Sequence, residues 1–242
     1  MNMDVTSLRA SLLQRLISTV YPPRCVLCGS PGFDDMDICE DCYHDLPWIG
    51  SACMQCAIPL AKHSGDQLKC GQCLQKPSAF DHSLSLFSYE KEAVTLIQQL
   101  KFNEKLAYSR LLGNMLADAI GKYAAELPDC ILPVPLYKKR LKQRGFNQSI
   151  ELARPVANTF GIPLDLQSVI RVRDTQSQTE LDKTQRRKNI RAAFEVVNPV
   201  GAQHVAVVDD VVTTTSTVNE VARILKRAGV RRVDVWSIAR AV

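Results

Sequence analysis

The sequence predicts an α/β protein with a mainly parallel sheet that has helices on both faces, preceded by a small metal-binding module. Two observations lead to this prediction. Four Cys-x2-Cys pairs are gathered within residues 25–73, and after them short apolar runs alternate with segments of helical periodicity. With 46% hydrophobic and 23% charged residues in 242, the composition is that of a globular protein with a sizeable core.

The cysteine pairs have the spacing of two zinc sites. Two cysteines separated by two residues form a tight knuckle that places both sulfurs on one metal, and two knuckles complete a tetrahedral site. Gaps of ten and thirteen residues within successive knuckle pairs favour sequential sites and leave an interleaved cross-brace open. Two structural zinc ions are therefore expected, with the ligand sets Cys25, Cys28, Cys39, Cys42 and Cys53, Cys56, Cys70, Cys73.

The alternatives for these cysteines are a disulfide-stapled module and a redox-active pair. The stretch 5–20 is interrupted by Arg9, Gln14 and Arg15, so it resembles neither an export signal nor a span of about 18 apolar residues. We therefore expect a cytoplasmic protein without membrane insertion, in which thiols stay reduced. Four equivalent pairs also argue against one privileged redox pair, and the ninth cysteine, Cys130, stands far from the rest.

Three segments follow from these patterns: an N-terminal amphipathic helix over 1–24, a double zinc ribbon over 25–76 and a larger domain over 77–242. In the larger domain, strands are expected at 83–89, 130–136, 205–208 and 233–238. Helices are expected over 93–102 and 108–123, from residue 150, and from residue 218. A basic loop, residues 137–148, connects the second strand to the next helix.

The candidate ligand site follows the apolar strand 205–208. Asp209 and Asp210 come where this strand is expected to end, and paired carboxylates there can hold the hydroxyls of a ribose. The next residues are rich in hydroxyls and lead into a helix, whose free N-terminal amides can bind a phosphate. We expect the phosphate-binding residues to be Thr213, Thr214, Thr215, Ser216 and Thr217. The alternative is an ordinary strand-turn-helix with acids that cap the helix.

Positive charge is concentrated beside this site. Residues 137–191 contain thirteen Lys or Arg and five Asp or Glu, whereas residues 25–80 contain three Lys and seven acids. The zinc module is therefore an unlikely surface for nucleic acid, and the basic surface belongs to the larger domain. The cations expected to meet a pyrophosphate or a nucleic-acid backbone are Lys138, Arg140, Arg144 and Arg186.

Taken together, these motifs resemble the ComF/GntX family, which joins zinc-ribbon knuckles to a type I phosphoribosyltransferase-like domain. Two acids followed by a Thr-rich loop are similar to the signature for phosphoribosyl pyrophosphate (PRPP), with Thr215 where a glycine is usual. The resemblance extends from residue 16 onward and includes the blocks 133–136, 144–149 and 185–189. It also implies that the segment from Arg171 to Asn189 is a mobile loop over the reaction centre.

The resemblance implies that PRPP or a nucleotide binds with Mg2+ at Asp209 and Asp210, and it links the protein to competence and DNA uptake. As an enzyme, the protein would transfer phosphoribose to an unknown acceptor by displacing pyrophosphate. The alternative is a non-catalytic protein that handles single-stranded DNA, or an adaptor for DNA-uptake or recombination proteins. The sequence leaves open whether the protein is an enzyme, with a phosphoribosyltransferase as the candidate activity.

Overall fold

The computed structural model describes residues 22–61, 69–102, 106–174 and 192–242. The chain divides into two compact units, Met1–Leu46 and Pro47–Val242. This division differs from the boundary expected between residues 76 and 77, because the second cysteine cluster falls in the larger unit. The expected helix over 1–24 lies almost entirely outside the described residues.

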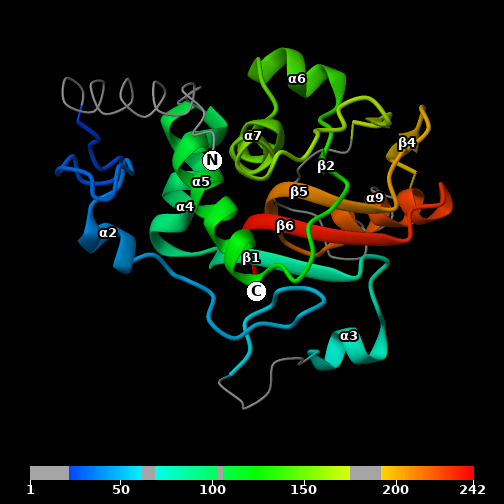
Figure 1. The fold of residues 1–242 in the computed structure, drawn as a ribbon, viewed down its shortest axis with the longest axis horizontal. Coiled ribbons are helices and arrows are strands. Elements are labelled where there is room, and N and C mark those ends of the chain that lie inside the picture. Colours follow the sequence, from blue (N-terminus) through cyan, green and yellow to red (C-terminus); the bar gives the residue numbers. More distant parts are fainter. Residues whose placement is uncertain (1–21, 62–68, 103–105, 175–191) are drawn as a thin grey trace, which may run out of the picture. The chain divides into compact units, whose positions relative to one another are not determined.

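The larger unit contains a four-stranded parallel sheet with the strand order β1-β6-β5-β2 (Figure 1). Its strands are β1 (His82–Ser88), β2 (Cys130–Pro133), β5 (His204–Val212) and β6 (Arg232–Arg240). The two central strands, β5 and β6, are the longest. A second, antiparallel sheet pairs β3 (Val169–Arg171) with β4 (Phe194–Val196). The predicted mainly parallel sheet is confirmed.

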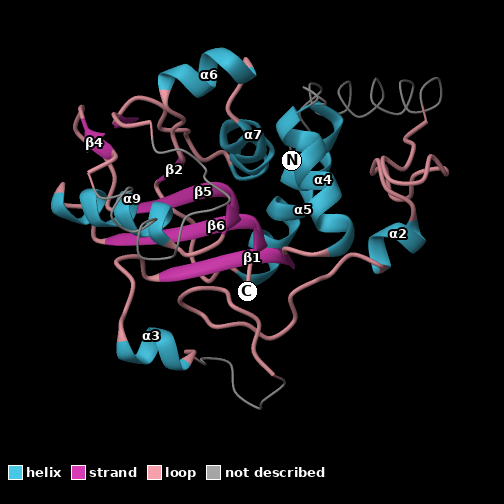
Figure 2. Cartoon of the chain, turned by 180° about the vertical axis from the view of Figure 1, so that it is seen from behind, coloured by secondary structure: helices cyan, strands magenta, loops and turns pink. Residues whose placement is uncertain are grey.

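Helices cover both faces of the sheet, as predicted. On one face, α5 (Leu106–Tyr123) and α7 (Gln148–Phe160) contact the strands, and α4 (Lys91–Phe102) packs on α5. The other face is covered by α9 (Ser216–Arg227), which contacts β5 and β6 (Figure 2).

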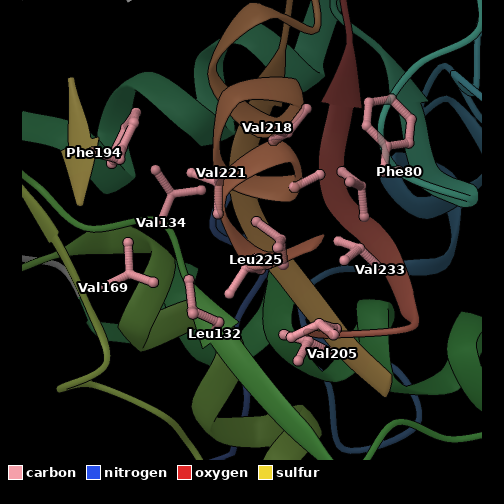
Figure 3. Packing of buried hydrophobic residues seen from close by; sticks show 14 of the residues in the cluster. Phe80, Leu132, Val134, Val169, Phe194, Val205, Val218, Val221, Leu225 and Val233 are labelled. Carbon is pink, nitrogen blue, oxygen red and sulfur yellow. The ribbon is translucent and has the colours of Figure 1, made fainter. Parts of the chain in front are cut away.

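Successive side chains of β5 point to opposite faces of the sheet. Val205 and Val207 share a buried cluster with Val221 and Leu225 of α9. Figure 3 shows Val205, Val221 and Leu225 of this cluster, which lies between α9 and the strands. The intervening residues of β5 therefore point towards the face on which α7 lies, and this parity carries on to Asp210.

Three expectations about local structure are wrong. The strand predicted at 205–208 continues to Val212, because its pairing with β6 extends to Val212 and Arg240. The basic segment expected to be a loop contains helix α6 (Lys138–Arg144), which ends at Gly145 with a left-handed φ of 80°. The strand expected over 130–136 ends earlier, at Pro133, because a following proline at 135 cannot donate to a ladder.

Candidate functional site

The cysteines form two compact clusters that match the sequential arrangement. In each cluster, the ligand atoms all lie within 4.8 Å of one another, which suits a single tetrahedral zinc. The clusters are Cys25, Cys28, Cys39, Cys42 in the smaller unit and Cys53, Cys56, Cys70, Cys73 in the larger unit. The interleaved cross-brace is therefore excluded. Each ribbon carries a structural zinc site.

The two ribbons repeat the same local structure. In the first, the amide of Gly29 donates to the carbonyl of Cys25 at 2.8 Å, and in the second the amide of Ala57 donates to that of Cys53 at the same distance. Gly29 and Ala57 both have positive φ, at 81° and 54°. The third ligand of each site precedes a five-residue helix, α2 (Glu40–His44) or α3 (Gly71–Gln75).

Asp209 and Asp210 lie where β5 extends past β2. Pairing of β5 with β2 ends at Val208, so both acids lie beyond the neighbouring strand. Asp210 is buried and Asp209 is partly buried. Each carboxylate accepts a hydrogen bond from the next backbone amide, at 2.9 Å for Asp209 and 2.7 Å for Asp210. These bonds fix the orientation of both acids.

The N-terminus of α7 faces this acid pair. Gln148 Nε2 donates to Asp210 Oδ2 and Ser149 Oγ donates to Asp209 Oδ1, each at 3.4 Å. The helix is held at this point by Asn147, which caps the amide of Ser149 at 3.0 Å and donates to the carbonyl of Val134 at 3.0 Å. The block 144–149, found in the sequence by resemblance, therefore contacts the acids directly.

Arg144 is connected to Asp210 through Gln148. Its Nη1 donates to Gln148 Oε1 at 2.7 Å, and Gln148 in turn contacts Asp210. Burial lowers the pKa of Arg144, while the charge of Asp210 opposes that shift. Arg144 remains a cation at any physiological pH, and it compensates the buried carboxylate through the amide between them.

The loop from Thr213 to Thr217 forms a hollow next to Asp209. A cavity of about 70 Å3 is lined by Asp209 and by residues 211–218. Helix α9 begins at Ser216, so its free N-terminal amides are at the lining of this cavity. The acids and the hydroxyl-rich loop predicted from the sequence are thus brought together.

Thr215 occupies the position where glycine is usual, with φ 59° and ψ −3°. This is the left-handed region, which a β-branched residue rarely adopts. The hydroxyl of Thr215 donates to the carbonyl of Thr214 at 2.6 Å, and Thr214 and Ser216 share a hydrogen bond of 2.9 Å between their hydroxyls. The loop therefore keeps the conformation that glycine would favour.

The four cations predicted from the sequence do not gather at one site. Arg144 is near the acids, and Arg140 forms an ion pair with Asp174 at 3.7 Å. Lys138 lines a separate hollow of about 470 Å3 together with Tyr137, Lys139, Lys142 and Gln143. Arg186, and the expected mobile loop beyond Asp174, lie outside the described residues.

Sequence reasoning missed Arg171 and Arg240. Arg171 packs on the ring of Phe194 at 5.3 Å, and burial lowers its pKa while Asp209 and Asp174 oppose the shift. Arg240 is buried at the end of β6, where it donates to the carbonyls of Val212, the last residue of β5, and Thr213, the first residue of the loop. A lone arginine at a strand end, far along the chain from its partners, has no local signal.

Two family models match the chain. Residues 16–74 match a double zinc ribbon domain, and residues 147–241 match a phosphoribosyl transferase domain. These matches confirm the predicted ribbon module and the type I phosphoribosyltransferase-like fold. No helix within the described residues combines the length and apolar character needed to cross a membrane.

Relatives of known name cover nearly the whole chain. The DNA utilization protein YhgH of Salmonella typhimurium is 38% identical over 226 residues, which span 91% of this chain and 98% of the relative. Competence protein F of Haemophilus influenzae is 32% identical over 231 residues, or 90% and 97% of the two chains. Among solved structures, a glutamine PRPP amidotransferase from B. subtilis complexed with ADP and GMP is 25% identical, with a TM-score of 0.36 over 53% of this chain and 25% of that chain.

Proposed function

We propose that this chain, which belongs to the ComF/GntX family, binds PRPP together with Mg2+ at Asp209, Asp210 and the loop that follows them. The observation that carries the proposal is the cavity lined by Asp209 and residues 211–218, at the start of a twelve-residue helix. An anion at a helix N-terminus is stabilised by free amides and by the helix dipole.

The donor set near the cavity suits a hard divalent cation. Carboxylate oxygens are the protein ligands that Mg2+ prefers, usually one or two of them together with phosphate oxygens and water. Asp209 lines the cavity, whereas Asp210 is buried and accepts a hydrogen bond from Gln148. We assign Asp209 to the metal and the ribose hydroxyls, and Asp210 to keeping Gln148 and Arg144 in position.

In a transfer reaction, Mg2+ would neutralise charge on the leaving pyrophosphate. The bond from the anomeric carbon to the pyrophosphate oxygen breaks with its electron pair leaving on pyrophosphate, and an acceptor atom bonds to the carbon. An oxocarbenium-like transition state of this kind is stabilised by nearby carboxylates. Arg144 is a cation at this end of the site, because it donates to Gln148, which in turn donates to Asp210.

Calorimetric titration of the zinc-loaded protein with PRPP, with and without Mg2+, tests the proposal. We expect saturable binding that requires Mg2+, that is lost in Asp209→Asn and that is weakened in Asp210→Asn. The exposed Asp118 on α5 offers a matched control, because Asp118→Asn removes the same charge outside the cavity. Equal binding by Asp209→Asn and wild type would reject the proposed site.

A second function is favoured by the other hollow. The exposed side of α6 presents Lys138, Lys139 and Lys142 beside Tyr137, a combination suited to the phosphates and bases of single-stranded DNA. The relatives' names, DNA utilization protein and competence protein, agree with such a role. A cytoplasmic location is part of the proposal, because eight zinc-binding thiols would stay reduced there.

Salt dependence tests this second function. Binding of a labelled oligonucleotide should fall with salt with a slope of about −0.7 for each phosphate neutralised. Replacing the three lysines by Gln should make the slope less steep by about 2, whereas Lys122→Gln on α5 should leave it unchanged. An unchanged slope in the triple variant would remove α6 from any DNA interface.

A further inference from the structure

Arg240 connects the second zinc ribbon to the loop proposed to bind phosphate. Its side chain extends from the end of β6 and only 5% of the residue is exposed. The Nε atom donates to the carbonyl of Cys56 at 2.8 Å, and Nη1 donates to the carbonyl of Val212 at 3.1 Å. Nη1 also contacts the carbonyls of Thr213 and Ala241. One guanidinium therefore joins a zinc ligand to the first residue of the loop.

The same knuckle is attached to the sheet and to α9 by further hydrogen bonds. Gln55, between the two cysteines, donates to the carbonyl of Phe80 at 3.3 Å, just before β1. The adjacent amide of Ala79 donates to Asn219 Oδ1 in the first turn of α9 at 2.7 Å. The knuckle is thus bonded to the segment before β1, and that segment is in turn bonded to the helix that follows the loop.

The metal is what fixes the knuckle itself. Among the described residues of the second ribbon, the buried cluster is made of Cys53, Cys56 and Cys73, with Ile58 and Leu60 packed against it. Such a small apolar cluster cannot hold a fold without a metal. We therefore expect zinc loss to free the Cys56 carbonyl, which is an acceptor of the buried Arg240 guanidinium.

We propose that the zinc of the second ribbon holds residues 213–217 in their ligand-binding conformation through Arg240, which acts as a positioning residue. The consequence for PRPP affinity rests on the proposed function, whereas the consequence for the loop itself does not. Coupling between the two sites is reciprocal, so a ligand in the loop strengthens zinc binding by the factor by which zinc strengthens ligand binding.

The two ribbons provide a matched pair of variants. Cys39 and Cys70 are each the third ligand of their site, and each precedes a five-residue helix. Cys70→Ser should raise amide hydrogen exchange at residues 213–217 and weaken PRPP binding about tenfold, within the range typical of coupled sites. Cys39→Ser, in the other compact unit, should change neither measurement.

Variants of Arg240 distinguish positioning from general destabilisation. Arg240→Ala should reproduce the loop exchange of Cys70→Ser, and combining the two should add nothing further, whereas two separate structural losses would add. Arg240→Lys keeps the charge, but a single ammonium cannot bond Cys56 and Val212 with the same fork, so it should not restore the coupling.

Zinc release from the wild-type protein keeps the test independent of how well any variant folds. With PRPP and Mg2+ present, equilibrium competition with a zinc-selective chelator should show an affinity about tenfold higher for the second zinc and an unchanged affinity for the first. Equal effects of Cys39→Ser and Cys70→Ser, or additive effects of Arg240→Ala and Cys70→Ser, would overturn the inference. Absence of PRPP binding by the wild type would instead refute the proposed function, and loop exchange would still decide the role of Arg240.

Discussion

The backbone conformation of Thr215 predicts how substitutions at this position change the stability of the protein. At φ 59° and ψ −3°, the residue is in the left-handed region, where a Cβ approaches the following carbonyl oxygen. Replacing Thr215 by Gly removes this clash, and replacing it by Ala keeps the clash. Both replacements lose the hydrogen bond from the Thr215 hydroxyl to the carbonyl of Thr214, so the two variants differ only in the Cβ.

The magnitude follows from two opposing contributions. Relief of the left-handed conformation favours Gly by about 1 to 2 kcal/mol, and the greater freedom of Gly in the unfolded chain offsets about 0.4 to 1 kcal/mol of this. We therefore expect Thr215→Gly to be more stable than Thr215→Ala by about 0.5 to 1 kcal/mol. Wild type should lie near the Gly variant, because its hydroxyl bond contributes about 1 kcal/mol.

Urea unfolding of the zinc-saturated proteins measures this order. The midpoints should rank Gly and Thr above Ala with unchanged slopes, since the change in exposed surface is the same. The Gly variant should also bind PRPP more tightly than wild type, because a phosphate can then approach the backbone. An Ala variant as stable as the Gly variant would refute the left-handed conformation of residue 215.

Two further predictions concern packing and thiol chemistry. A Cβ at Gly113 would lie 2.6 Å from Pro155 Cγ and 3.0 Å from the carbonyl of Leu152, so Gly113→Ala should destabilise the protein by about 1 to 3 kcal/mol in urea unfolding. A Cβ at Gly121, on the same helix, would lie 3.4 Å from its nearest atom, Phe160 Cζ, which is an ordinary contact. Gly121→Ala should therefore raise the free energy of unfolding by up to about 1 kcal/mol. Equal losses of stability in the two variants would contradict the close approach of α5 and α7 at Gly113. Burial raises the pKa of Cys130 to about 11. The folded protein therefore favours the neutral thiol, and this contribution to the free energy of unfolding is fully present below the unfolded pKa of about 8.5. It declines as the pH rises from there towards 11. At pH 8, mass spectrometry after zinc chelation and alkylation should find eight modified cysteines and an unmodified Cys130, and modification of all nine at one rate would contradict its burial.

The zinc ligands and the sheet could be predicted because their signals are local. A knuckle needs two cysteines at a fixed spacing, and a buried parallel strand needs a short apolar run. The end of β5 could not be predicted in this way, since Asp209 and Asp210 interrupt the apolar run while hydrogen bonding to β6 continues past them. Helix α6 was missed because its sequence, Lys138–Arg144, is almost entirely basic and has no apolar period.

The candidate site could be predicted only in part for a related reason. Asp209, Asp210 and the loop are contiguous in sequence, so one motif identifies them together. The residues that position them come from elsewhere: Gln148 lies 62 residues from Asp210, and Arg240 lies 184 residues from Cys56. Contacts of such separation depend on the complete sheet, and no periodicity in the sequence reports them.

The contrast between the two ribbons shows how one motif acquires two roles. Their turns have the same hydrogen bonds, so the cysteine spacing alone makes them equivalent. They differ inside the knuckle, where the first has Leu27 and the second has Gln55, which is buried and donates to Phe80 beside β1. They also differ at the second ligand, because Cys28 is exposed while Cys56 is buried and its carbonyl accepts from Arg240. In this chain, Gln55 therefore distinguishes the ribbon that is bonded to the segment before β1 from the ribbon in the smaller unit, which has Leu27 at the same place.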